Sequence, residues 1–213
     1  MNDKNYDVVI VGGGISGAAL FYELAKYTDV KRICMLEKYE ALATLNTKGT
    51  SNSQTIHVGD IETNYTLEKA KITKRTAKMV EKFCLQYGLE NKVMFAHQKM
   101  ALGVGDKEVD FITKRYHEFK ELFPYLELWD KEKLKELEPK LVEMPDGSDR
   151  PENIVAMGAK DQYTTVDFGK MTEELVKQAQ ACEGVVTDVY FNSEVEDIKK
   201  TSDGYELKTT KGE

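Results

Sequence analysis

A run of glycines between two apolar segments limits most strongly what this chain can fold into. Residues 12–17 read Gly-Gly-Gly-Ile-Ser-Gly and fit the pattern G-x-G-x-x-G. A β-branched segment at 7–11 precedes them, apolar residues at helical spacing occupy 15–27, and another apolar run covers 32–36. The β-branched run at 7–11 predicts a strand buried on both faces, the apolar run at 32–36 predicts a second strand, and the segment between them predicts a helix. Residues 7–37 are therefore expected to form a βαβ unit of a parallel sheet, which places the chain in the α/β class.

The glycines of this turn have separate roles in a dinucleotide-binding unit. Gly12 permits the tight turn, Gly14 lets the backbone approach a pyrophosphate, and Gly17 lets the helix and strand pack closely. The phosphates are expected beside Ile15 and Ser16, because N–H groups and the helix dipole favour an anion at a helix N-terminus. A glycine-rich turn that binds no ligand is the alternative.

A carboxylate follows the second predicted strand, because Glu37 lies about 20 residues after Gly17. At this position a carboxylate accepts hydrogen bonds from a ribose 2′-hydroxyl, and it would repel the 2′-phosphate of NADP. NAD and FAD both remain open. Glu37 and its neighbour Lys38 are therefore predicted to bind the cofactor.

Composition excludes several classes of protein. The 30 Lys and Arg residues against 37 Asp and Glu give a net charge of -7, which argues against a nucleic-acid partner. The three cysteines suggest neither a disulfide framework nor a metal site, and reduced thiols are typical of a cytoplasmic protein. Because no signal-peptide pattern and no run of ~20 apolar residues is present, we expect a protein that is soluble or attached to a membrane surface.

The rest of the chain predicts mixed α and β structure. Residues 40–60 are rich in Thr, Asn, Ser and Gly and predict a long loop. All four prolines lie between 124 and 151, and this cluster predicts a lid or connector rather than a core element. Because the chain ends within or just after a predicted hairpin, we expect it to be the N-terminal part of a longer protein. Helices are expected at 66–87, 109–119 and 166–181, and strands at 92–105, 153–159, 186–191, 194–199 and 204–210.

A polar segment in the long loop favours FAD over NAD. Residues 50–59 read T-S-N-S-Q-T-I-H-V-G and resemble the N-S-x-x-I-H-x-G element of the amino-acid-oxidase-like flavoproteins. The resemblance implies that this segment runs along FAD. Three successive residues would supply side-chain hydrogen bonds, the next two would offer backbone N–H groups near the flavin ring, and the final glycine would leave room for the ring. A solvent-exposed loop is the alternative. The implied contacts are Ser51, Asn52 and Ser53, then Gln54 and Thr55, and finally Gly59.

Residues 52–66 narrow the resemblance further. They read N-S-Q-T-I-H-V-G-D-I-E-T-N-Y-T and resemble the malate:quinone oxidoreductase family, in particular its shorter bacterial branch. The resemblance implies FAD, oxidation of (S)-malate to oxaloacetate, electron transfer to a membrane quinone, and a peripheral position on the inner, cytoplasmic face of the cell membrane. It also implies a Rossmann-type FAD-binding domain at 1–90 and 160–213, with the start of an α+β substrate-binding region at 91–159.

Malate oxidation would need a base for the hydroxyl proton. His57 lies within the flavin-side motif and is the candidate base, with support of the loop or no role as alternatives. In related flavoproteins the strand that holds Val195 contacts the adenine, so Val195 joins the predicted cofactor-binding residues. No metal site is predicted. The alternatives in function are a related 2-hydroxy-acid enzyme such as L-2-hydroxyglutarate dehydrogenase, an NAD-dependent dehydrogenase, and a fragment that binds nucleotide weakly or not at all.

Overall fold

The computed structural model describes residues 5–211, which divide into two compact units. Unit 1 comprises the chain up to Gln54 together with the chain from Asp167 onward, and unit 2 is the intervening segment Thr55–Val166. Helix α2 (Leu67–Gln86) therefore lies in unit 2, whereas the sequence placed it with the nucleotide-binding part. The assignment of cofactor to one unit and substrate to the other stays a prediction.

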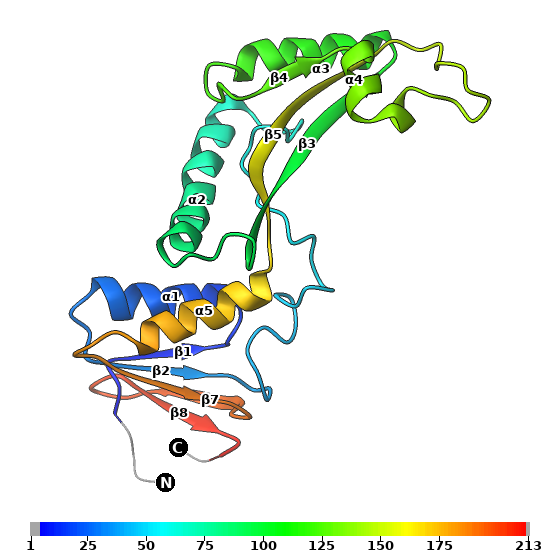
Figure 1. Ribbon diagram of the computed structural model, residues 1–213. Coiled ribbons are helices and arrows are strands. Elements are labelled where there is room, and N and C mark those ends of the chain that lie inside the picture. The colour runs from blue at the N-terminus through cyan, green and yellow to red at the C-terminus, as the bar shows by residue number, and fades with distance from the viewer. Residues whose placement is uncertain (1–4, 212–213) are drawn as a thin grey trace. The chain divides into compact units, whose positions relative to one another are not determined.

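Unit 1 is built on a three-stranded parallel sheet in the order β1-β2-β6, which confirms the predicted α/β class and βαβ unit. Helices α1 and α5 pack against each other on one face of this sheet, and the hairpin of β7 and β8 lies on its other side (Figure 1). The elements are β1 (Val8–Val11), α1 (Ile15–Tyr27), β2 (Arg32–Leu36), α5 (Phe168–Gln180), β6 (Val186–Tyr190), β7 (Val195–Lys200) and β8 (Tyr205–Thr209).

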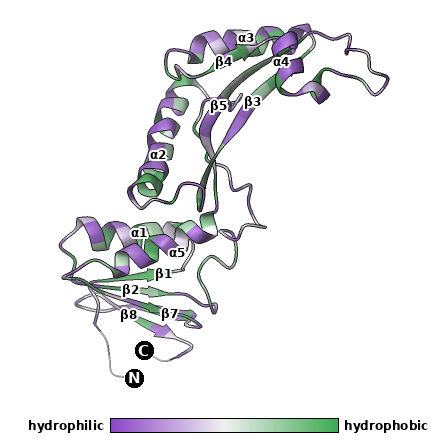
Figure 2. Cartoon of the chain, in the orientation of Figure 1, coloured by the Kyte–Doolittle hydropathy of each residue, from purple (hydrophilic) through white to green (hydrophobic). Residues whose placement is uncertain are grey.

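The core of unit 1 is centred on β2. Ile33 and Met35 are fully buried there, and Phe21 of α1 is buried too. Figure 2 shows β1 and β2 largely in the hydrophobic colour. The prediction that β1 is buried on both faces is wrong: Ile10 is 6% exposed, but Val8 and Val9 are only partly buried and Val11, at the end of the strand, is 55% exposed.

Asp167 caps the N-terminus of α5. Its Oδ1 accepts a hydrogen bond from the backbone N–H of Lys170 at 3.0 Å, and its Oδ2 lies 3.1 Å from the Lys170 ammonium. Burial opposes ionisation, but the bonds and charge of Lys170 outweigh it, so the pKa of Asp167 falls below its usual value.

Asp167→Ala should lower the free energy of unfolding by ~1 kcal/mol at neutral pH, because it removes this cap. Since the carboxyl pKa is lower in the folded chain than in the unfolded one, the contribution is present above the unfolded pKa and is lost as the pH falls through the folded pKa. Urea unfolding at neutral and acidic pH measures both effects. Glu173→Ala, on an exposed position of the same helix, is the matched control. Equal destabilisation by the two variants would contradict the cap.

Unit 2 contains an antiparallel sheet in the order β3-β5-β4, with α3 packed on β3 and β5. Its main core includes Phe119, Phe123 and Met157, all fully buried. The predicted strand at 153–159 extends to Val166, and 92–105 holds a single long strand. Besides α2, the elements are β3 (Met94–Val104), α3 (Asp106–Phe119), β4 (Glu127–Trp129), α4 (Lys131–Leu137), a 3₁₀ turn (Pro139–Leu141) and β5 (Ile154–Val166).

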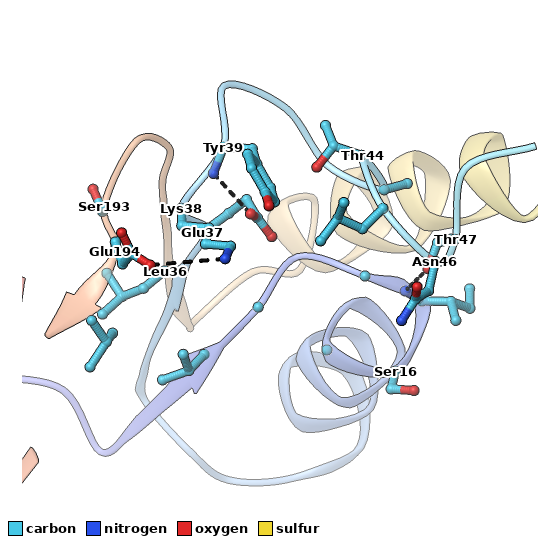
Figure 3. A pocket seen from close by; sticks show the side chains of 18 residues that line it. Ser16, Leu36, Glu37, Lys38, Tyr39, Thr44, Asn46, Thr47, Ser193 and Glu194 are labelled. Carbon is cyan, nitrogen blue, oxygen red and sulfur yellow. Dashed lines mark hydrogen bonds and ion pairs between the residues drawn. The ribbon is translucent and has the colours of Figure 1, made fainter. Parts of the chain in front are cut away.

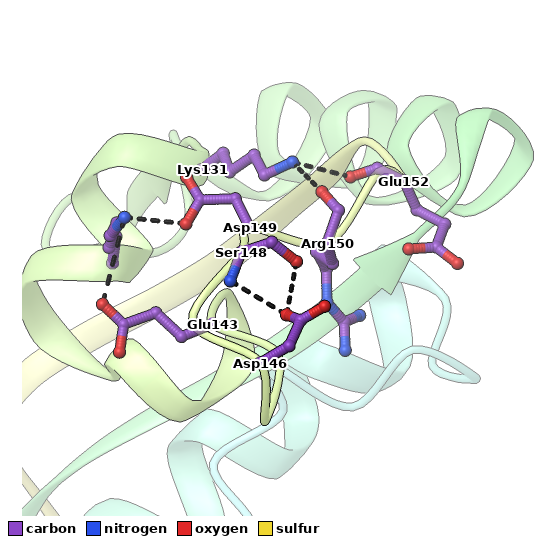
Figure 4. Close-up of polar contacts among 8 residues, drawn as sticks. Lys131, Glu143, Asp146, Ser148, Asp149, Arg150 and Glu152 are labelled. Carbon is purple, nitrogen blue, oxygen red and sulfur yellow. Dashed lines mark hydrogen bonds and ion pairs between the residues drawn. The ribbon is translucent and has the colours of Figure 1, made fainter.

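The proline-rich segment forms part of a core, so the prediction of a lid or connector is wrong. Trp129 is 1% exposed, and Leu134 and Val142 are fully buried in a second hydrophobic cluster with β5. Polar contacts hold its surface loop: Asp146 Oδ1 accepts hydrogen bonds from the backbone N–H of Ser148 at 3.0 Å and from its hydroxyl at 2.6 Å (Figure 4). Proline clustering alone did not reveal the apolar side chains that this segment buries.

Candidate functional site

The carboxyl ends of β1 and β2 and the segment that follows β6 line a cleft of about 550 Å³ within unit 1 (Figure 3). Ligands of open parallel sheets bind at this edge, and the volume lies in the range of small-molecule sites. The predicted cofactor-binding residues that line the cleft are Gly12, Gly14, Ile15, Ser16, Gly17, Glu37, Lys38 and Val195.

The glycine turn leads from β1 into the N-terminus of α1. Gly12 has φ +106°, in the region that favours glycine. A Cβ on Gly17 would lie 2.0 Å from the carbonyl oxygen of Gly12, so close packing of helix and turn requires this glycine. Gly14 caps the helix without a side-chain hydrogen bond, and residues 14–17 at this helix N-terminus line the cleft. The N–H groups of a first helical turn have no acceptor within the helix. This arrangement suits an anion such as a pyrophosphate.

The carboxylate of Glu37 is held by two backbone N–H groups. Its Oε2 accepts from Gly13 at 2.6 Å and its Oε1 from Tyr39 at 2.9 Å, and the residue is 7% exposed. Ionised carboxylate oxygens offer about four acceptor positions, so this geometry leaves capacity for a ribose hydroxyl. Charge-assisted bonds of this kind fix the carboxylate before any ligand arrives.

The segment after β6 forms the opposite wall. Ser193 donates its backbone N–H to the carbonyl of Glu37 at 2.9 Å, and Val195 begins β7 beside it. Lys38 Nζ lies 3.9 Å from Glu194, across exposed side chains (Figure 3). An exposed pair of this kind contributes little to stability.

The sequence reasoning missed further residues that line the cleft: Val11, Leu36, Tyr39, the loop 43–47, Ser193 and Glu194. Thr47 is 7% exposed, and its Oγ1 accepts a hydrogen bond from the N–H of Ile15 at 3.1 Å. The signal available for Ser193 and Glu194 was that they follow a third predicted strand, whose carboxyl end would meet those of the first two. No local pattern distinguished Thr47 from the other loop threonines.

The predicted flavin-side residues Ser51, Asn52, Ser53, Gln54, Thr55 and Gly59 do not line this cleft. Asn52 Nδ2 donates to the carbonyl of Asn46 at 2.8 Å and so holds the loop together. Gln54 Oε1 accepts from the N–H of Phe168 at 2.7 Å, at the start of α5. Their contacts with a cofactor stay predictions.

Packing against α2 within unit 2 explains why residue 59 is a glycine. Its φ is +93°, and a Cβ there would lie 3.0 Å from Cα of Ala70 in α2. Thr55 forms an antiparallel bridge with Thr165 in the same unit. These contacts show that part of the polar segment is fixed by protein, although its composition suggested an irregular loop.

His57 is exposed, and its Nδ1 lies 3.1 Å from Oε1 of Glu62. The sequence reasoning named Glu62 only as part of a motif and gave it no role. Across residues 5–211 there is no group of three or more His, Cys, Asp or Glu side chains that could hold a metal ion.

Comparison with solved structures identifies the fold. A glycine oxidase from Geobacillus kaustophilus matches 97% of this chain and 52% of its own, with a TM-score of 0.71 and 22% identity. An L-alpha-glycerophosphate oxidase from Mycoplasma pneumoniae, solved with FAD bound, matches 98% of this chain and 50% of its own, with a TM-score of 0.70 and 23% identity. The predicted fold class is confirmed.

Comparison of sequences identifies the family. A probable malate:quinone oxidoreductase of Campylobacter jejuni is 57% identical over 99% of this chain and 47% of its own length. The malate:quinone oxidoreductase of Helicobacter pylori is 45% identical over 94% of this chain and 44% of its own. The chain thus spans about half the length of these relatives. The family described as malate:quinone oxidoreductase matches residues 4–212, and this chain belongs to that family.

Proposed function

We propose that the cleft of unit 1 binds FAD. The N–H groups at the start of α1 would hold the pyrophosphate, Glu37 would accept from the ribose, and the wall at Ser193 to Val195 would contact the adenine. The support lies in the fit: a glycine turn that excludes a Cβ at Gly17 and a buried carboxylate with acceptor positions remaining. The flavin end would continue along residues 51–59, whose contacts with FAD remain part of this proposal.

We further propose that the protein carrying this chain oxidises (S)-malate to oxaloacetate and passes the electrons to a membrane quinone. The observation that carries this proposal is the family match over residues 4–212 on a chain whose glycine turn and Glu37 line one cleft. FAD would supply the redox chemistry by taking hydride from malate and passing electrons on. His57 would accept the proton of the malate hydroxyl at Nε2, because its Nδ1 already faces Glu62.

We propose a peripheral position on the cytoplasmic face of the cell membrane, where a quinone is accessible. No helix within residues 5–211 is both long and apolar enough to cross a membrane.

Anaerobic mixing of the full-length protein with 2-hydroxy acids tests the activity. Malate should bleach the flavin absorbance, and a quinone should restore it. Faster bleaching by 2-hydroxyglutarate than by malate would contradict the substrate. A protein that reduces added NAD with malate and releases no flavin would contradict the whole proposal.

A further inference from the structure

A histidine and a carboxylate are in hydrogen-bond contact at the start of unit 2. His57 Nδ1 and Glu62 Oε1 are 3.1 Å apart, with side-chain exposures of 58% and 15%. The other carboxylate oxygen, Oε2, is buried, and it has no hydrogen-bond partner among the described residues. Among the described residues, the carboxylate of Glu62 therefore bonds to the imidazole through Oε1. The other ring nitrogen of His57, Nε2, makes no bond to Glu62.

The backbone that presents Glu62 is clamped from α3. Arg115, 7% exposed, donates from Nη2 to the carbonyl of Glu62 and to that of Tyr65, the latter at 2.8 Å. The Arg115 guanidinium also lies 4.0 Å from the ring centroid of Phe119. A buried guanidinium with two carbonyl acceptors holds the turn at 62–65 in one position.

A second anchor lies between the histidine and the glutamate. Asp60 is fully buried and contacts Lys99 Nζ of β3 at 2.5 Å and the hydroxyl of Tyr125 at 2.7 Å. Burial, followed by the charge of Asp60, raises the pKa of Tyr125, so this hydroxyl remains a donor. The five-residue path from His57 to Glu62 is thus fixed to the sheet at one point and to α3 at another.

An acceptor at one ring nitrogen decides where a neutral imidazole carries its proton. With Glu62 at Nδ1, the proton is placed on Nδ1, and Nε2 becomes the acceptor. The same carboxylate stabilises the imidazolium after Nε2 has taken a proton. We propose that Glu62 is a positioning residue that fixes the tautomer and orientation of His57, so that Nε2 receives the substrate hydroxyl proton. This inference rests on the proposed function for its substrate.

The tautomer can be measured on the 213-residue chain without cofactor or activity. The chain has three histidines, so ¹⁵N–¹H correlation spectra can resolve each ring, and His57→Gln identifies the signal of His57. At about pH 9, where an ordinary imidazole is neutral, we expect the wild-type ring to carry its proton mainly on Nδ1. Glu62→Ala should move the majority to Nε2. Glu62→Gln keeps the size and a weaker acceptor, and it should give an intermediate ratio.

Glu68→Ala, at an exposed position six residues on, is the matched control and should leave the ratio unchanged. If Glu62→Ala failed to fold, as judged by circular dichroism, the ratio in Glu62→Gln would decide. An unchanged tautomer ratio in a folded Glu62 variant would overturn the proposal.

The rate of flavin reduction in the full-length protein provides a second test of the role of Glu62. Glu62→Ala should slow reduction by malate by about 10- to 100-fold with little change in the KM, because proton transfer and not substrate binding is impaired. An effect on the KM alone would contradict a positioning role. If wild-type protein were reduced by no 2-hydroxy acid, the proposed function would fail, while the tautomer ratio would still decide whether Glu62 orients His57.

Discussion

Replacing Gly17 with alanine is expected to lower the affinity for FAD at least about 100-fold, equivalent to ~2.8 kcal/mol. The new Cβ would lie 2.0 Å from the carbonyl oxygen of Gly12 and 3.3 Å from Cγ2 of Ile10. Since the first of these neighbours is backbone, the turn itself must open, and the N–H groups at the start of α1 would move away from the phosphates. Overpacking should also lower the free energy of unfolding by ~1–3 kcal/mol.

Equilibrium dialysis of the full-length protein with FAD measures the affinity, and urea unfolding of the 213-residue chain measures the stability. Gly49→Ala is the matched control, because a Cβ there meets no atom within 4 Å. A Gly17→Ala protein that binds FAD as tightly as the Gly49→Ala protein would show that the turn does not hold the pyrophosphate.

Replacing Glu37 with alanine is expected to weaken FAD binding by ~1.5–3 kcal/mol, the cost of losing a hydrogen-bonded charge. This corresponds to a rise of about 10- to 150-fold in the dissociation constant. The variant also leaves the N–H groups of Gly13 and Tyr39 without their carboxylate acceptor, so the chain should lose stability as well. Glu37→Gln keeps one acceptor oxygen and should fall between the wild type and Glu37→Ala.

Glu40→Ala is the control for Glu37, because it removes an exposed carboxylate from the same loop. Its affinity for FAD should match that of the wild type. If Glu37→Ala left the affinity for FAD unchanged, the proposed bond between Glu37 and the ribose would be contradicted, even if the variant were less stable. The two bonds to backbone N–H groups would then be the role of this carboxylate.

The elements next to the glycine turn could be predicted because their information is local. Apolar spacing predicted the bounds of α1 and β2 correctly, and the helix predicted at 66–87 is α2 together with its N-cap Thr66 and its C-cap Tyr87. Glu37 could be placed for the same reason, since the length of the βαβ unit sets where its second strand ends.

Contacts between distant segments could not be predicted in this way. Gln54 bonds Phe168 across 114 positions, and Thr47 bonds Ile15 across 32. Such contacts form only when the folded chain brings distant loops and helices together, and the spacing of neighbouring residues carries no information about this. The burial of Trp129 within the proline-rich segment is of the same kind, because it depends on β5 lying beside it. His57 and Glu62 are only five residues apart, so their proximity could have been predicted from the sequence. The position of the Glu62 carboxylate could not, because it depends on hydrogen bonds from Arg115, which lies in a distant helix.

The cofactor released from freshly purified full-length protein tests most directly whether the cleft of unit 1 takes FAD. Its absorbance spectrum and its mass after denaturation identify it in one experiment. We expect a yellow protein that releases FAD in a ratio near one per chain. A colourless protein that releases a nicotinamide dinucleotide, or that binds one in preference to added FAD, would contradict the account.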